Sequence, residues 1–402
     1  MSQIRPDAFL RADGRKGIRN IVAVVYLVEC AHHVAREIQS PFRTGDVHLL
    51  GFPGCYPNAY AHRMLESLCT HPNVGAALVV SLGCEGFDRD RLLESIRGSG
   101  RPADLLVIQH AGGTRSTIQH GQRWIEEVLG RLEATPRGPM ASRDLVVGTI
   151  CGGSDGTSGI TANPAIGRAF DRLVADGAAC IFEETGELIG CEEALAARAV
   201  APELAAMLVA AVDKAARYYA VLGHGSFAPG NAEGGLTTQE EKSAGAYSKS
   251  GSAPISGLLK PADVPRGGGL YLLDVVPDGD VRFGFPNIND NAEIAELAAC
   301  GAHLTLFSTG RGSVVGSAIS PVVKVCANPR TYRALADDMD VNAGRILEGE
   351  AGLDDVGAEI HRLVMEVAAG RRTASESLGH REFSLGYKQF EPTGPSCHPS
   401  HA

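Results

Sequence analysis

The sequence has 402 residues, 44% of them hydrophobic, and a formal net charge of −10. A chain of this length can bury at least two cores, and it has no basic block interleaved with aromatic residues that would favour nucleic acid. No run approaches the ~20 apolar residues that span a bilayer, and the first residues lack the apolar stretch of a signal peptide. The sequence therefore predicts a cytoplasmic protein that contacts neither membrane nor nucleic acid.

The first third of the chain alternates short apolar runs with helix-like stretches. We expect buried strands at 21–28, 46–52, 76–82 and 104–109. The helices expected after them lie at 31–39, 58–68, 88–96 and 114–132. Such alternation is typical of a mainly parallel sheet wrapped by helices, so we predict an α/β fold of Rossmann-like or flavodoxin-like type.

A polar, proline-containing stretch at 134–143 predicts a boundary between one α/β domain at 1–138 and a second at 139–402. Strands of the second domain are expected at 145–149, 178–182, 270–275, 303–307 and 322–325. Its helices are expected at 164–176, 187–197, 202–219, 292–300, 331–338 and 354–369. Residues 223–269 are expected to form a long irregular, glycine-rich functional loop, and the tail after Phe390 is expected to fray.

Thiols follow four of the predicted strands, at Cys30, Cys55, Cys84 and Cys151. Since the ligand crevice lies beyond the carboxyl ends of parallel strands, these thiols and Glu85 could bind a transition metal such as Fe(II), or part of an iron–sulfur cluster. A buried structural role is the alternative for each cysteine taken alone. The ten cysteines include no Cys-x-x-Cys pair, which favours free thiols over disulfides or a zinc ribbon. His110 stands at a fifth strand end, unlike the other histidines.

The segment from Cys151 to Pro164 combines the end of a strand, a glycine-rich turn and the start of a helix. Backbone N–H groups at such a helix start favour an anion, which makes Ser154 and Asp155 candidates for binding a substrate carboxylate. The alternative is a structural turn that needs glycine for its backbone angles. The segment is not a dinucleotide-binding fingerprint.

Two further segments offer cations. Thr237 or Thr238 could cap a helix, with a glutamate three residues later completing a capping box. Lys242 would then lie one turn inside that helix, as a base, as a carboxylate partner or as an ordinary exposed lysine. Arg311 stands between two glycines, where its guanidinium could grip a carboxylate, although a solvated loop arginine would look the same.

Five segments together resemble the large catalytic part of the altronate and galactarate dehydratase family: DGRKGIRN (13–20), LGCE (82–85), CGGSDGTSGITANP (151–164), PGNAEGGLTTQEEKS (229–243) and FSTGRG (307–312). The resemblance extends from about Phe9 to Phe383. It implies a lyase that removes water from a small hydroxylated acid with the help of Fe(II) or Mn(II). The residues that correspond to the family's motifs are Arg19, Asn20, Cys55, Cys84, Glu85, Cys151, Asp155, Glu184, Glu187, Thr237, Lys242 and Arg311.

These positions give a mechanistic hypothesis. Arg19, Arg311 or the turn after Cys151 holds the substrate carboxylate, with Asn20, Thr237 and Thr238 nearby. A metal near Cys84 and Cys151, with Cys55 and Glu85 as further ligands, polarises an oxygen. Lys242 or His110 removes the α-proton, and Glu184 assists the leaving hydroxyl, which gives a 2-keto-3-deoxy acid.

The sequence departs from the family in two respects. The small β-rich domain that usually precedes the Arg-Asn motif is absent, so a separate small subunit could supply it, as in the related sulfolactate sulfo-lyases. The family's Ser-His-Thr-Tyr-Gly-Cys stretch is here Gly-Phe-Pro-Gly-Cys, ending at Cys55, which leaves the substrate open. Alternatives are therefore a lyase that releases sulfite from sulfolactate, or an acid-binding subunit that is inactive without a partner. We also expect a homo-oligomer.

Overall fold

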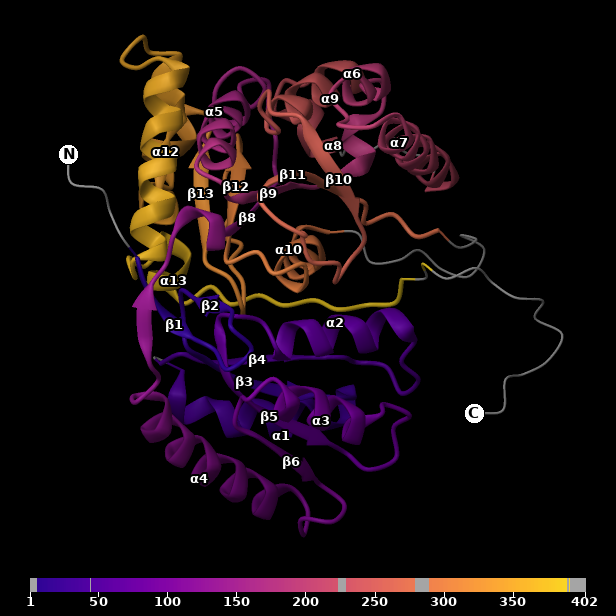
Figure 1. Ribbon diagram of the computed structural model, residues 1–402, viewed down its shortest axis with the longest axis vertical. Helices are drawn as coiled ribbons and strands as arrows, with labels where there is room; N and C mark the ends of the chain where they lie inside the picture. The colour runs from indigo at the N-terminus through magenta and orange to yellow at the C-terminus, as the bar shows by residue number, and fades with distance from the viewer. Residues whose placement is uncertain (1–5, 44, 223–228, 279–288, 389, 391–402) are drawn as a thin grey trace, which may run out of the picture.

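A computed structural model describes residues 6–43, 45–222, 229–278, 289–388 and 390. The first part of the chain forms a parallel four-stranded sheet in the order β4-β3-β5-β6 (Figure 1, lower half). Its strands are β3 (Ile21–Tyr26), β4 (Val47–Gly51), β5 (Val74–Ser81) and β6 (Ala103–Val107). Its helices are α1 (Glu29–Gln39), α2 (Ala59–Cys69), α3 (Arg89–Gly98) and α4 (Thr114–Leu132).

Alternate residues of this sheet belong to two separate cores. Val24 and Leu78 pack with α1 and α4 on one face, whereas Val25 and Val79 pack with α2 and α3 on the other. Because both faces are covered, every residue of β5 is buried, which explains why the strand is a continuous apolar run without alternation.

The second part forms a parallel seven-stranded sheet in the order β10-β11-β9-β8-β12-β13-β14. Its strands are β8 (Val146–Cys151), β9 (Ala179–Phe182), β10 (Ile255–Leu259), β11 (Gly269–Leu273), β12 (Leu304–Thr309), β13 (Val322–Cys326) and β14 (Val341–Asn342). Its helices are α5 (Ala162–Ala175), α6 (Glu192–Ala197), α7 (Pro202–Leu222), α8 (Pro229–Glu233), α9 (Gln239–Ser248), α10 (Asp290–Ala299), α11 (Pro329–Ala334), α12 (Leu353–Ala368) and α13 (Ala374–Leu378). Short 3-10 turns are η1 (Ser40–Phe42), η2 (Ser142–Asp144), η3 (Thr185–Leu188), η5 (Ala336–Asp338) and η6 (Ala343–Ile346).

Helix α10 lies between the two parts of the molecule (Figure 1). Ile294 and Leu297 pack against the seven-stranded sheet, whereas Ala295 and Ala298 belong to the core that α2 and α3 build. Residues 292–299 are all buried for this reason. The helix therefore couples the two sheets, and its first turn projects toward the site described below.

A small antiparallel sheet joins the N-terminus to the segment between the two parts. It consists of β1 (Asp7–Leu10), β2 (Lys16–Gly17) and β7 (Arg137–Pro139), in the order β2-β1-β7. Ala8, Ile18 and Met140 extend into the core of the seven-stranded sheet. Ala8 and Ile18, near the start of the described residues, are thus part of the second core.

The predicted α/β class with parallel sheets is confirmed. The expectation of an irregular segment at 223–269 is wrong from residue 229 onward, since α8, α9 and β10 occupy much of it. Residues 223–228, like the tail after Phe390, fall outside the described part of the chain. Across the described residues, no helix combines the length and apolarity needed to cross a membrane.

Candidate active site

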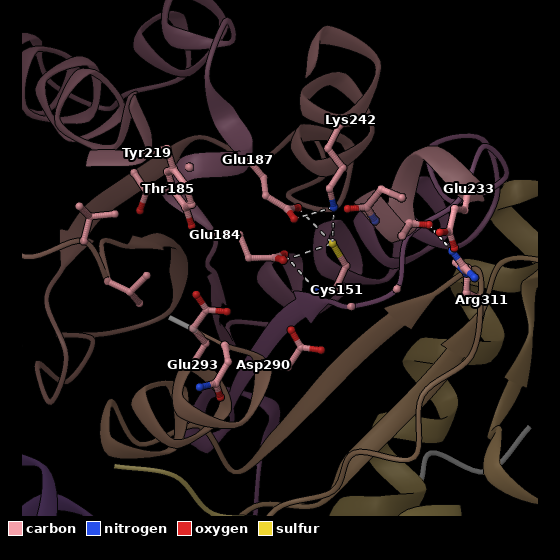
Figure 2. Close-up of a pocket in the computed structure, with 18 of the residues that line it drawn as sticks. Cys151, Glu184, Thr185, Glu187, Tyr219, Glu233, Lys242, Asp290, Glu293 and Arg311 are labelled. Carbon is pink, nitrogen blue, oxygen red and sulfur yellow. Dashed lines mark hydrogen bonds and ion pairs between the residues drawn. The ribbon is translucent and has the colours of Figure 1, made fainter. Parts of the chain in front are cut away.

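A cavity of about 620 Å³ opens at the carboxyl ends of β8 and β9. Such an edge is where open parallel sheets bind ligands. The residues that line the cavity come from six segments, 151–153, 184–187, 230–242, 275–276, 289–293 and 311–312, together with Tyr219. Many of the side chains that line the cavity are charged (Figure 2).

Cys151, the last residue of β8, lies at the centre of this cavity wall. Its thiol donates hydrogen bonds to Glu184 Oε1 at 3.2 Å and Glu187 Oε2 at 3.1 Å. Glu184 also accepts the Cys151 backbone N–H at 2.9 Å. The backbone of Glu184 is left-handed, with φ +79°, a conformation that costs a non-glycine residue about 1 kcal/mol or more and that often marks a functional site.

Two buried lysines balance these two carboxylates. Lys242 Nζ lies 2.5 Å from Glu187 Oε1, 2.9 Å from Ser154 Oγ and 3.2 Å from Cys151 Sγ. Lys249, at the end of the same helix α9, forms an ion pair with Glu184. The seven-residue spacing of the lysines places them on one helix face.

The two carboxylates have opposite shifts in pKa. Burial and the neighbouring Glu187 raise the pKa of Glu184 to about 7, against the pull of Lys249. Burial would raise the pKa of Glu187 as well, but Lys242 and Lys249 outweigh it and lower that pKa below its usual value. Burial raises the pKa of the Cys151 thiol. For Lys242, burial opposes the charged form, but Cys151 and Glu187 raise the pKa, so the ammonium persists at neutral pH.

Asp290 and Glu293, in the first turn of α10, face this cluster across the cavity (Figure 2). Burial and the negative charge of Glu187 raise the pKa of Asp290 to about 6. Burial and Glu184 raise the pKa of Glu293 as well. A Cβ at Gly152 would overlap the Asp290 carboxylate, so the glycine next to Cys151 is what allows this close approach.

Cys151, Glu184 and Glu187 could hold a metal ion, since one ligand atom from each lies within 4.8 Å of the others. A thiolate and two carboxylates suit a divalent transition metal. Binding would require the thiol to lose its proton, and the ion would share carboxylates that the two lysines now neutralise. The donor set is therefore compatible with a metal.

Arg311 lies at the rim of the cavity. Its Nη1 donates to Gly230 O and lies 3.0 Å from Glu233 Oε2. Its Nε and Nη2 form no hydrogen bond to the described residues. The side chain is 41% exposed, so the guanidinium has donors available for a carboxylate.

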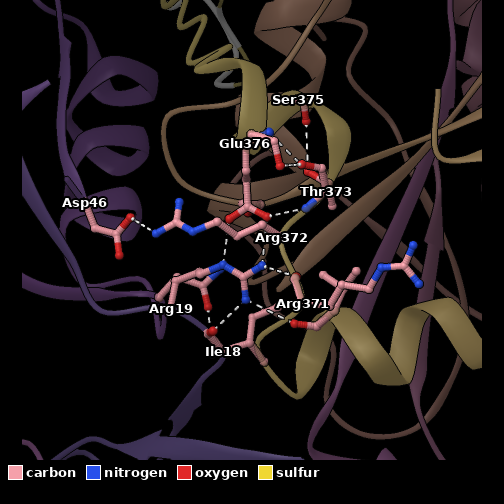
Figure 3. Close-up of polar contacts among 12 residues, drawn as sticks. Ile18, Arg19, Asp46, Arg371, Arg372, Thr373, Ser375 and Glu376 are labelled. Atoms are coloured by element: carbon pink, nitrogen blue, oxygen red, sulfur yellow. Dashed lines mark hydrogen bonds and ion pairs between the residues drawn. The ribbon is translucent and has the colours of Figure 1, made fainter. Parts of the chain in front are cut away.

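Arg19 and Asn20, predicted to bind substrate, are not among the described residues that line the cavity. Arg19 lies at the junction of the N-terminal and C-terminal segments (Figure 3). Arg19 Nε and Nη2 donate to both oxygens of Glu376, at 2.6 and 2.8 Å, and its remaining bonds go to carbonyl oxygens of Ile18, Val367 and Arg371. Asn20 binds Arg11, Leu132 and Thr135. These hydrogen bonds hold the fold together, and the substrate-binding role of the two residues stays a prediction.

Three other predicted substrate binders also have structural partners. Asp155 accepts hydrogen bonds from Thr157, Ser158 and Asn328, and so fixes the turn after Cys151. Thr238 is the N-cap of α9, as predicted, and accepts the N–H of Glu241 at 3.1 Å. Thr237 donates to the Glu241 carboxylate at 2.7 Å. These residues position Ser154 and Lys242 without lining the cavity.

The predicted metal set is divided between two places. Cys55, Cys84 and Glu85 lie beyond the four-stranded sheet and share no group of potential ligands with Cys151 among the described residues. Glu85 Oε2 accepts N–H groups of its own loop, at 2.9 and 3.2 Å. His110 is exposed after β6 and does not line the cavity. The described structure groups Cys151 with Glu184 and Glu187 instead, and a metal site shared by Cys55, Cys84, Glu85 and Cys151 stays a prediction.

The sequence reasoning assigned no role to Lys249, Asp290 or Glu293. The seven-residue spacing from Lys242 was a usable signal for Lys249. Asp290 and Glu293 lie in the first turn of α10, whose start is two residues earlier than predicted. Acidic residues are common in the first turn of any helix. Nothing local distinguishes them from such residues.

Two family models match the chain. The model for D-galactarate/altronate dehydratase, C-terminal, matches residues 142–390, and that for D-galactarate dehydratase/altronate hydrolase, second domain, matches residues 8–133. The chain belongs to the D-galactarate and altronate dehydratase family. The resemblance inferred from the motifs is confirmed, and the chain is an enzyme of this hydro-lyase family.

Curated relatives extend the match over most of the chain. The (2R)-sulfolactate sulfo-lyase subunit beta of Chromohalobacter salexigens is 33% identical over 94% of this chain and 96% of its own length. The altronate dehydratase of Bacillus subtilis is 30% identical over 94% of this chain and 76% of its own length. The galactarate dehydratase (L-threo-forming) of Escherichia coli is 31% identical over 80% of this chain and 62% of its own length.

Proposed function

We propose that the enzyme removes water from a small hydroxylated carboxylic acid, a sugar acid such as an aldonate or aldarate, to give a 2-keto-3-deoxy acid. The observation that carries the proposal is the cavity at Cys151, which combines a rim guanidinium, a buried ammonium and carboxylates with opposite pKa shifts. An elimination of this kind needs a cation for the substrate carboxylate, a base for the α-proton and an acid for the hydroxyl. Each need has a candidate there.

Arg311 binds the substrate carboxylate. It is the cation at the rim, and its Nε and Nη2 have no hydrogen bond to the described residues. A planar guanidinium can bind a carboxylate through two parallel hydrogen bonds. This contact orients the α-carbon toward the interior of the cavity.

Asp290 takes the α-proton. With a pKa of about 6 it is largely ionised at neutral pH, yet more basic than an ordinary aspartate. Lys242, for which the sequence suggested the role of base, keeps its proton and so cannot take one. Its buried ammonium assists the leaving hydroxyl as a hydrogen-bond donor. His110, the other base suggested by the sequence, lies outside the cavity lining.

Cys151, Glu184 and Glu187 would hold the metal, for which Fe(II) or Mn(II) is our assignment. When bound there, the ion supplies Lewis-acid polarisation of a substrate oxygen. This assignment moves Glu184 from the predicted role of acid to that of ligand, because its carboxylate contacts the Cys151 thiol.

A second candidate is carbon–sulfur cleavage with release of sulfite. It is favoured by one observation: the chain matches 96% of the length of the sulfo-lyase subunit beta but 76% of an altronate dehydratase. For both reactions we also propose that the chain forms a homo-oligomer and that it works with a separate small β-rich subunit. In a third version the chain binds the acid and is inactive until that subunit joins it.

Purified enzyme loaded anaerobically with Fe(II) or Mn(II) tests these versions. It is incubated with a panel of aldonates, aldarates and sulfolactate, and 2-keto acid and sulfite are measured separately. A 2-keto-3-deoxy product from a sugar acid supports dehydration, whereas sulfite from sulfolactate supports the second candidate. Activity that appears only with an added small β-rich subunit supports the third version. No product under any of these conditions contradicts all three.

A further inference from the structure

Three exposed thiols lie at the carboxyl edge of the four-stranded sheet, away from the cavity. Cys30, Cys55 and Cys84 are exposed, whereas the other cysteines of the described chain are buried or half-buried. Cysteine is among the residues most often buried. Three exposed thiols in one place therefore need an explanation other than packing.

The register of the sheet relates the three cysteines to one row of paired residues. Tyr26, on the central strand β3, pairs with Gly51 of β4 on one side and with Val80 of β5 on the other. Cys30, Cys55 and Cys84 each follow their member of this row by four residues. Three adjacent parallel strands are thus each followed by one thiol, which lies at the start of α1 for Cys30 and in the following loop for Cys55 and Cys84.

Backbone contacts draw the three segments together. The Glu29 N–H donates to Pro53 O at 3.1 Å, which joins the start of α1 to the loop of Cys55. The Gly86 N–H donates to Cys55 O at 2.8 Å, which joins the loop of Cys55 to that of Cys84. A Cβ at Gly86 would lie only 3.3 Å from Cys55 O, so the two loops are in close contact.

Glu85 fixes the loop that carries Cys84. Its Oε2 accepts the N–H groups of Gly83 at 2.9 Å and Cys84 at 3.2 Å. Gly83 has φ +121°, a conformation that a side chain would strain. The carboxylate that the sequence suggested as a ligand thus positions a thiol.

We propose that Cys30, Cys55 and Cys84 bind a [4Fe–4S] cluster, with one thiolate on each of three irons and a non-cysteine ligand on the fourth. In the described chain, only Cys151, Glu184 and Glu187 come within the 4.8 Å spacing of donors around a single ion. The three thiols come from the first turn of α1 and from two loops, and such a set of separate segments suits a cubane, where each thiolate binds a different iron. Each thiol gives up its proton on binding, and two ferrous ions, two ferric ions and four sulfide ions supply the cluster in its 2+ state. The site is independent of the proposed lyase function.

The test uses the full chain, reconstituted anaerobically with equal amounts of ferrous and ferric iron and with sulfide. We expect uptake of iron and acid-labile sulfide in equal amounts, broad visible absorbance, and an electron paramagnetic resonance signal after reduction. Cys30→Ser, Cys55→Ser and Cys84→Ser should each lose most of the bound sulfide and absorbance. Cys191→Ser, a half-buried cysteine at the start of α6, is the matched control and should retain both.

Three results would overturn the proposal: iron bound without sulfide, a Cys55–Cys84 disulfide in place of cluster uptake, or serine variants that take up the cluster like the control. Circular dichroism and the melting temperature separate a lost ligand from a lost fold. Cys151→Ser separates the two sites, since it should lower the divalent metal content of the cavity and spare the cluster. A chain that assembles the cluster but has no lyase activity would support this inference and contradict the proposed function.

Discussion

Two buried networks of charge in this enzyme look alike in composition and differ in their surroundings. At the junction of the N-terminal and C-terminal segments, every guanidinium nitrogen of Arg19 donates to Glu376 or to a backbone carbonyl. The adjoining space, about 10 Å³, has room for about one water. Around Cys151, the lysine–glutamate pairs border a cavity of about 620 Å³ and include groups with opposite pKa shifts. Both networks match family motifs. The cavity network differs from the junction network in two ways: it borders open space, and some of its groups can gain or lose a proton near neutral pH.

Loss of the buried ammonium should give the largest effect. Lys242→Met is expected to lower kcat by ~100- to 10,000-fold, because the leaving hydroxyl loses its hydrogen-bond donor. Steady-state kinetics on folded protein measure this, and His110→Ala, outside the cavity, is the control that should keep wild-type kcat. A Lys242→Met enzyme with wild-type kcat would place the chemistry elsewhere.

The junction should respond in stability and not in rate. Arg19→Met leaves the largely buried Glu376 carboxylate without its partner, which is expected to cost about 3–5 kcal/mol of unfolding free energy. Denaturant unfolding measures it. Arg137→Met removes the exposed pair with Asp7 and should cost at most about 1 kcal/mol. If Arg19→Met raised KM with little loss of stability, the contrast between the two networks would collapse.

Asp290→Asn should sharpen the contrast by moving activity and stability in opposite directions. In the wild type, kcat/KM should rise as the pH passes upward through about 6, where the base ionises, and the variant should lose this limb with about a hundredfold drop in rate. Because the folded pKa lies above the ordinary 3.8, unfolding free energy falls as the pH rises from 3.8 to about 6 and then remains lower. Asparagine removes that cost, so the variant should be about 1–3 kcal/mol more stable near pH ~8. A destabilised variant with an unchanged pH profile would contradict the assignment.

Arg311→Ala should give the smallest effect, a KM raised about tenfold with kcat nearly unchanged, as expected for loss of a binding contact at a half-exposed site. Arg311→Lys should recover part of the affinity, because a point charge remains without the paired donors. Initial rates over a range of substrate concentrations separate KM from kcat. An equal fall in kcat for both variants would show that Arg311 acts on the transition state instead.

Elements were predicted best where burial gives a long, regular pattern of apolar residues in the sequence. The fully buried β5 and the amphipathic α4 were predicted nearly to the residue, whereas the two-residue strands β2 and β14 are too short to show any period. Strand β10 was missed among glycine, serine and proline, whereas the start of α9 was predicted from its capping threonine, Thr238. For the site, Lys242 and Arg311 do line the predicted pocket. Arg19 could not be separated from them by motif, because its partner Glu376 lies 357 positions away.

The N-terminal strand has a consequence for how the enzyme is made. Ala8 and Ile18 are synthesised long before α12, yet the core that they enter includes residues of that helix. Domains usually fold in the order of their synthesis. Here the segment with Ala8 and Ile18 cannot complete its packing until α12 has been synthesised. Cutting the gene at the boundary between the two family models would therefore separate Ala8 and Ile18 from the core in which they pack. Co-expression of the two pieces should yield more soluble protein than either piece alone.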